Sequence, residues 1–86
     1  MDSVESFVDE VDVDGDRAVH TLDVRDLPPP QPLQETLESL IELDADAVLV
    51  QINDRIPQFI FPQLEERGYR FRTFEEADAV VTVIWR

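Results

Sequence analysis

The fold of this chain is decided by its central run of apolar residues, Ala47-Val48-Leu49-Val50-Gln51-Ile52. Five of these six residues are apolar, and Asp46 and Asn53 bound the run on either side. Such a short, nearly unbroken and β-branched run predicts a strand that is buried on both faces of a sheet. The segments before and after this strand then determine which elements cover it.

A helix is predicted before the central strand. Apolar residues recur there at the i, i+4, i+7 and i+8 positions that form one helix face: Leu33, Leu37, Leu40 and Ile41. Four prolines at positions 28, 29, 30 and 32 precede this helix and cannot lie inside a sheet or a helix, because each removes a backbone donor. A first strand is expected upstream of them, at residues 18–24.

A second helix and two further strands are predicted after the central strand. Pro57 opens this helix and Gly68 ends it, while Pro62 either kinks it or starts a fresh turn. The residues expected to face the core are Phe59, Ile60, Leu64 and, as an open alternative, Phe61. The alternating segments 69–74 and 80–85 predict a hairpin.

The element order is therefore β-α-β-α-β-β, which predicts an α+β domain with helices packed on one face of a four-stranded sheet. We expect this single domain at residues 17–86. Residues 1–16 carry seven of the 20 acidic residues and no basic residue. A segment of this composition predicts a flexible acidic arm in front of the domain.

Charge is the most informative bulk property of the chain. The chain has 20 acidic residues and seven basic residues, all of them Arg, so its net charge is −13. A dense carboxylate surface repels itself in dilute buffer and is screened in concentrated salt, where the Debye length falls to about 3 Å at 1 M. The composition resembles that of haloarchaeal proteins and predicts adaptation to high salt, with an acidic protein of an ordinary cytosol as the alternative.

The same composition excludes several functions and locations. The arginines form no basic stripe for nucleic acid, and acidic helix faces are repelled by anionic lipid, so we expect neither partner. The chain has no Cys, no basic signal-peptide start and no apolar run long enough to span a membrane, which predicts a cytoplasmic protein. With His20 as the only His, we expect no enzymatic activity, metal site or cofactor.

Residues 22–32, Leu22-Asp23-Val24-Arg25-Asp26-Leu27-Pro28-Pro29-Pro30-Gln31-Pro32, resemble the opening of the TusA/SirA sulfur-carrier family. They resemble still more closely an uncharacterised sister family with a triple-proline opening. The likeness extends from about residue 19 to residue 86. It implies a two-layer sandwich with a mixed sheet in the order 1-2-4-3, which the periodicity alone leaves undecided.

The resemblance also indicates a candidate binding site. In the sulfur carriers a Cys-Pro-x-Pro motif places a reactive cysteine at the N-terminus of the first helix. Pro29 stands at the cysteine position here, and Pro30 and Pro32 match the two family prolines, so we expect no sulfur-carrier activity. What remains is a helix N-terminus whose expected binding residues are Arg25, Pro29, Pro30, Pro32, Asn53, Asp54 and Arg55.

Two functions are compatible with this site. The first is a non-catalytic protein-interaction or regulatory module that binds another protein through the proline loop, with a link to redox, sulfur or metal-enzyme metabolism that the resemblance implies. The second is a small-molecule or anion-binding module that acts at the N-terminus of the first helix. We expect a monomer rather than a dimer in either case.

Overall fold

The structure, a computed structural model, describes residues 4–11 and 17–86. Its elements in chain order are α1 (Val4–Asp9), β1 (Val19–Asp23), α2 (Gln31–Glu42), β2 (Val48–Asn53), α3 (Ile60–Glu66), β3 (Arg70–Glu75) and β4 (Val80–Trp85). From β1 onwards this is the predicted order of elements. The structure adds the short helix α1 in front of it.

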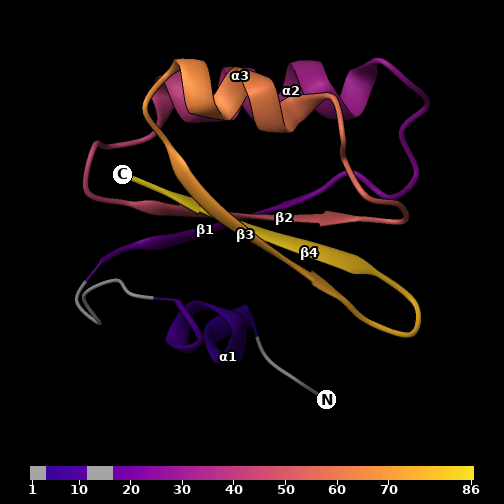
Figure 1. Ribbon diagram of the computed structural model, residues 1–86, viewed down its shortest axis with the longest axis horizontal. Coiled ribbons are helices and arrows are strands. Elements are labelled where there is room, and N and C mark those ends of the chain that lie inside the picture. Colours follow the sequence, from indigo (N-terminus) through magenta and orange to yellow (C-terminus); the bar gives the residue numbers. More distant parts are fainter. Residues whose placement is uncertain (1–3, 12–16) are drawn as a thin grey trace.

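The four strands form one mixed sheet in the order β1-β2-β4-β3 (Figure 1). β1 pairs with β2 in parallel, and β4 runs antiparallel to both β2 and β3. The predicted mixed sheet and its order 1-2-4-3 are therefore confirmed. β2 and β4 occupy the two central places and are buried along nearly their whole length, as the apolar runs predict.

Helices α2 and α3 cover one face of this sheet (Figure 1). The core on that face is formed by buried aliphatic side chains from both helices and from the two central strands: Leu40, Leu49, Ile60, Leu64 and Ile84. Phe61 of α3 stacks on Phe71 of β3, with 4.9 Å between the ring centroids. The sequence left open whether Phe61 faces the core, and the structure shows that it packs against it.

Two residues that were expected to face the core lie in solvent instead. Ile41 is 78% exposed, because Leu40 directs the last turn of α2 towards the sheet and the next residue is rotated about 100° away. Phe59 is 83% exposed, because it lies just before the helix that begins at Ile60 and is not on its buried face. The predictions for both side chains are wrong.

The boundaries of α3 explain how it accommodates Pro62. The helix begins at Ile60, so the proline lies in the first turn, where a missing N–H leaves no intrahelical bond unmade. Beyond the last turn Gly68 has a φ of +80°, and its N–H donates to the carbonyl of Glu65 at 3.1 Å. This left-handed glycine ends the helix, as predicted.

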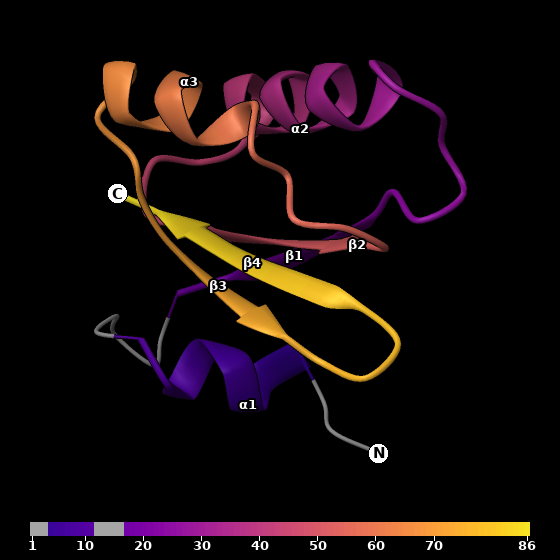
Figure 2. The ribbon, with the colours of Figure 1, turned by 45° about the vertical axis from the view of Figure 1, so that its right-hand side comes forward.

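Helix α1 lies on the opposite face of the sheet from α2 and α3 (Figure 2). Val8 and Val11 are buried there in a cluster with the outward-facing valines of β2 and β4 and with Trp85. The guanidinium of Arg72 also donates to the carbonyl oxygen of Glu10 at 3.0 Å. The predicted flexible acidic arm spans residues 1–16. Within it, Val8 and Val11 are buried against this face of the sheet. Residues 1–3 and 12–16 lie outside the described residues.

None of the helices in residues 4–11 and 17–86 is long and apolar enough to cross a membrane.

Candidate functional site: an uncharged groove

The candidate site lies at the end of the sheet where β1 and β2 terminate. In the strand register, Asp23 is opposite Ile52, and Asn53 is opposite Val80. The chain leaves β1 into the proline loop and leaves β2 into the loop that leads to α3. Both loops therefore run from this end of the sheet up to the helix layer (Figure 1).

A groove of about 790 Å³ separates these two loops. One wall is formed by the proline loop and the first turn of α2, with Leu27, Pro29, Pro30, Pro32 and Leu33. The other wall is formed by the loop after β2 and the start of α3, with Asp54, Arg55, Ile56, Pro57, Gln58, Phe59, Ile60 and Gln63. Gln51 and Asn53 of β2 line it between the walls. Prolines on both sides restrict the backbone, so the walls have little conformational freedom to lose on binding.

A chain of buried polar side chains runs beneath this groove. Thr36, Gln51 and Asn53 are each at most 3% exposed. The hydroxyl of Thr36 donates to the carbonyl of Pro32 at 2.7 Å and accepts from Nε2 of Gln51 at 2.8 Å. Nδ2 of Asn53 donates to Oε1 of Gln51 at 3.4 Å, and Oδ1 of Asn53 accepts from the backbone N–H of Asp54 at 2.8 Å. The chain thus connects Pro32 in one wall to Asp54 in the other.

The groove is electrically neutral although the protein is strongly acidic. Its lining contains one acidic residue, Asp54, and one basic residue, Arg55. These two form an ion pair with each other, with Nε of Arg55 3.2 Å from Oδ1 of Asp54. The net charge of −13 is therefore carried entirely by residues outside the groove lining.

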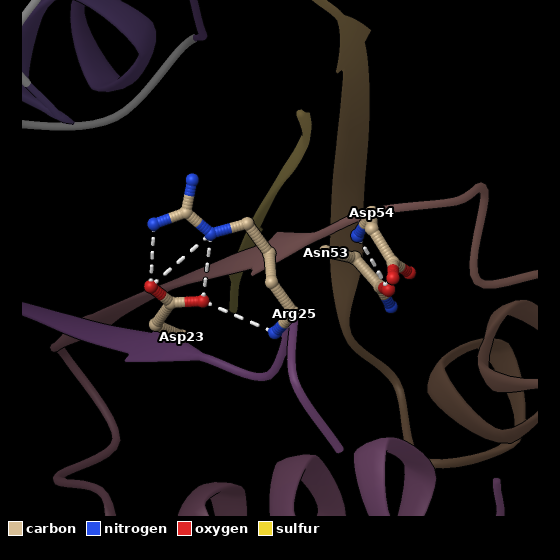
Figure 3. Close-up of polar contacts among 4 residues, drawn as sticks. All are labelled: Asp23, Arg25, Asn53 and Asp54. Atoms are coloured by element: carbon tan, nitrogen blue, oxygen red, sulfur yellow. Dashed lines mark hydrogen bonds and ion pairs between the residues drawn. The ribbon is translucent and has the colours of Figure 1, made fainter. Parts of the chain in front are cut away.

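The structure brings six of the seven predicted site residues together around the groove: Pro29, Pro30, Pro32, Asn53, Asp54 and Arg55. Arg25 is not among the lining residues. Its guanidinium binds the carboxylate of Asp23 instead, with distances of 3.0 Å and 2.8 Å to the two oxygens. Figure 3 shows this pair lying apart from Asn53 and Asp54.

The ion pair at the end of β1 also shifts the pKa values of both of its members. The hydrogen bond from the Arg25 side chain, together with one from its backbone N–H, holds the pKa of Asp23 below its usual value of 3.8. The pKa of Arg25 is raised, first by that hydrogen bond to Asp23 and then by the charges of Asp23, Asp78 and Asp26. Arg25 is thus already committed to a carboxylate of its own chain.

The first turn of α2 also differs from the free helix N-terminus that the sequence led us to expect. The N–H of Gln31 donates to the carbonyl of Pro28 at 2.9 Å, and that of Gln34 donates to Pro30 at 3.1 Å. Pro32 has no N–H. Most amides of residues 31–34 are therefore not available to an anion. In the described part of the chain, moreover, no group of three His, Cys, Asp or Glu side chains could hold a metal ion.

Sequence reasoning missed much of the groove, above all Ile56, Gln58 and Phe59. One signal could have indicated these residues. Segments 27–34 and 55–64 contain no acidic residue, although about one residue in four of the whole chain is acidic. Other long stretches without acidic residues lie largely in strands. Residues 27–30 and 55–58 lie in loops instead, so burial in a strand does not explain why they lack acidic residues.

Comparison with known protein families identifies this domain. Residues 21–86 match the family described as Uncharacterized conserved protein (DUF2249). Neither a curated protein nor a solved structure matches the chain. The matched range contains β2, β3, β4, both helices of the α2/α3 layer and every residue of the groove, while α1 precedes it. Because this range covers well over half of the sequence, the chain belongs to the DUF2249 family of uncharacterized conserved proteins.

Proposed function

We propose that this domain is a non-catalytic protein-interaction module that binds an apolar anchor residue of another protein in the groove between the proline loop and α3. One observation carries the proposal: a neutral groove of about 790 Å³ on a chain with a net charge of −13. A hydrated acidic surface keeps a protein soluble, so a neutral apolar region on it indicates contact with a partner.

The aromatic side chain at the edge of the groove supports a protein partner. Phe59 is 83% exposed and Ile56 is 39% exposed. Exposing a phenyl ring to water forgoes the burial free energy of about 1.5–3 kcal/mol that such a side chain gains in a core. Aromatic residues are the usual anchors of protein interfaces, where a partner supplies that burial.

A small uncharged molecule is the second candidate occupant. The groove volume falls within the range of about 300–1,000 Å³ that is common for small-molecule sites. Such sites enclose most of their ligand, however, whereas Phe59 in the groove wall is 83% exposed. The anion that the sequence suggested has less support, because Arg25 binds Asp23 and most amides of the first turn of α2 are engaged.

The proposal also covers the evolutionary and cellular setting. The sheet order, the two-helix layer and the proline loop support placement in the TusA/SirA-like superfamily. Pro29 at the position of the sulfur-carrying cysteine supports a function without sulfur transfer, although a link to redox, sulfur or metal-enzyme metabolism stays part of the proposal. The excess of acids and the absence of Lys support a cytoplasm of high salt concentration.

The proposal is tested by capturing partners from a lysate at native salt with three immobilised proteins: wild type, Phe59→Ser and Ile41→Ser. Ile41 is the matched control, because its side chain is 78% exposed and does not line the groove. Both replacements remove one exposed apolar side chain, and circular dichroism verifies that both variants fold. We expect one protein to be enriched by wild type and by Ile41→Ser, and not by Phe59→Ser.

Two results would count against this function. Equal capture by Phe59→Ser and wild type would show that the groove does not take part in binding. Equal loss with both variants would indicate non-specific adhesion of exposed apolar side chains. If no protein is enriched, the protein-partner proposal fails and the small-molecule candidate takes its place, to be tested by mass spectrometry of ligands that co-purify with the native protein.

A further inference from the structure

Beside the neutral groove, four carboxylates form what we term the acidic rim: Asp26, Glu75, Glu76 and Asp78. Asp26 directly precedes Leu27 of the groove wall. The other three lie at the hairpin turn between β3 and β4. This turn is at the same end of the sheet as Asn53, because Asn53 and Glu75 both pair with Val80, one on each side of β4. Figures 1 and 2 show the hairpin turn and the loop after β2 at the same end of the sheet.

No ion pair in the described part of the chain involves a carboxylate of the acidic rim. A basic side chain near the rim is Arg25, whose pKa the charges of Asp78 and Asp26 help to raise, after its hydrogen bond to Asp23. The two ion pairs found there join Arg25 to Asp23 and Arg55 to Asp54, so the two arginines at this end of the sheet already have carboxylate partners. All four rim residues are exposed. Four exposed carboxylates therefore lie at the same end of the sheet as a groove that has no net charge of its own.

From this arrangement we infer that the segment which docks in the groove carries basic side chains next to its apolar anchor. The apolar residue occupies the space between Pro30 and Phe59, and Arg or Lys side chains on either side of it meet the acidic rim. Opposite charges that meet at the edge of an apolar contact fix its register. This inference rests on the proposed function, since it specifies the chemistry of the partner segment.

The test uses a displayed library of random twelve-residue peptides, selected at about 0.1 M salt or at the lowest concentration at which the domain stays folded. We expect the enriched peptides to contain an aromatic or large aliphatic residue flanked by Arg or Lys. Four variants then separate the two parts of the contact. Phe59→Ser removes the groove anchor and Ile41→Ser is its control, while the pair Glu76→Gln and Asp78→Asn neutralises the rim and the pair Glu65→Gln and Glu66→Gln makes the same charge change on α3.

The rim double variant should weaken binding of the selected peptides about three- to tenfold, and the α3 double variant should weaken it less than twofold. The difference should shrink but persist at about 1 M salt, where the Debye length is about 3 Å and only charges in direct contact still interact. Enriched peptides without basic residues, or equal binding by both double variants, overturn the inference on the rim while the groove function stands. If no enriched peptide loses its binding in Phe59→Ser, the proposed function itself fails.

Discussion

Replacing Thr36 by Val tests whether the buried polar chain beneath the groove is a connected unit. Val has nearly the shape of Thr and a similar helix propensity, so the change removes little besides the hydroxyl group. That hydroxyl accepts from Gln51 at 2.8 Å and donates to Pro32 at 2.7 Å. Its loss leaves a buried amide N–H of Gln51 without its acceptor, at a cost of about 1–3 kcal/mol.

The magnitude is large for a domain of this size. Small domains are stable by only about 5–15 kcal/mol, and each kcal/mol corresponds to about 4–8 °C in the melting temperature. Urea unfolding, followed by circular dichroism and by the fluorescence of Trp85, measures the loss. The informative comparison is the same substitution in a Gln51→Leu background, where no amide is left to lose its partner. There Thr36→Val loses only the bond to Pro32 and should cost about 1 kcal/mol less than in wild type.

A second threonine provides the control for this double-mutant cycle. The hydroxyl of Thr73 lies 3.1 Å from that of Thr82 and makes no bond to Gln51. Because Thr82 stands opposite Gln51 in the strand register, Thr73→Val measures any unspecific coupling across the sheet, and its cost should differ between the two backgrounds by less than that of Thr36→Val. If Thr36→Val costs the same in both, or costs nothing in wild type, Thr36 and Gln51 are not coupled and the chain does not connect the two walls.

Three further predictions concern the rest of the molecule. Val8→Asp should detach α1 and move the fluorescence emission of Trp85 to longer wavelength while circular dichroism retains the sheet; an unchanged emission would show that α1 does not cover this tryptophan. Lowering the salt from about 1 M to about 0.01 M lengthens the Debye length tenfold and should expand or unfold the domain, whereas full folding in dilute buffer would contradict salt adaptation. The pKa of Asp23, held low by Arg25, should return towards 3.8 in Arg25→Gln, as ¹³C carboxyl titration by NMR can measure. Because this pKa is lowered in the folded state, the pair stabilises the fold above pH 3.8 and loses its effect as the pH falls through the folded pKa; identical titrations in both proteins would refute the pairing.

The sheet and its helices were predictable because burial shapes the sequence directly. The run at residues 47–52 is apolar because β2 is covered on both faces, and Gly68 stands where the chain needs a positive φ. Helix α1 was hidden by composition, since its apolar residues Phe7 and Val8 lie in a segment rich in Asp and Glu. Whether such a segment docks depends on the other face of the sheet being free, and local sequence does not contain that information.

The site was predictable in part, for a similar reason. Helix starts and strand ends can be located along the chain, so residues next to them, such as Pro30 and Asn53, were identified. Arg25 was expected to serve the same site, but Asp23 lies two residues away and captures its guanidinium. Phe59 was assigned to the core because the sequence shows only that it is apolar. The structure places it just before the start of α3 at Ile60, where its side chain is exposed.

The buried polar chain favours a functional groove over an accidental gap between two loops. A core with aliphatic side chains at positions 36 and 51 would satisfy the packing with no polar group to desolvate, and such replacements are often neutral in stability. The stability of the fold alone therefore does not explain why positions 36 and 51 carry the polar residues Thr and Gln. Their hydrogen bonds do fix Pro32 relative to Asp54, and so they set the distance between the two walls. A module that recognises a partner by an apolar anchor benefits from this fixed geometry. Loops that are already held in place before binding lose less conformational entropy when the partner binds.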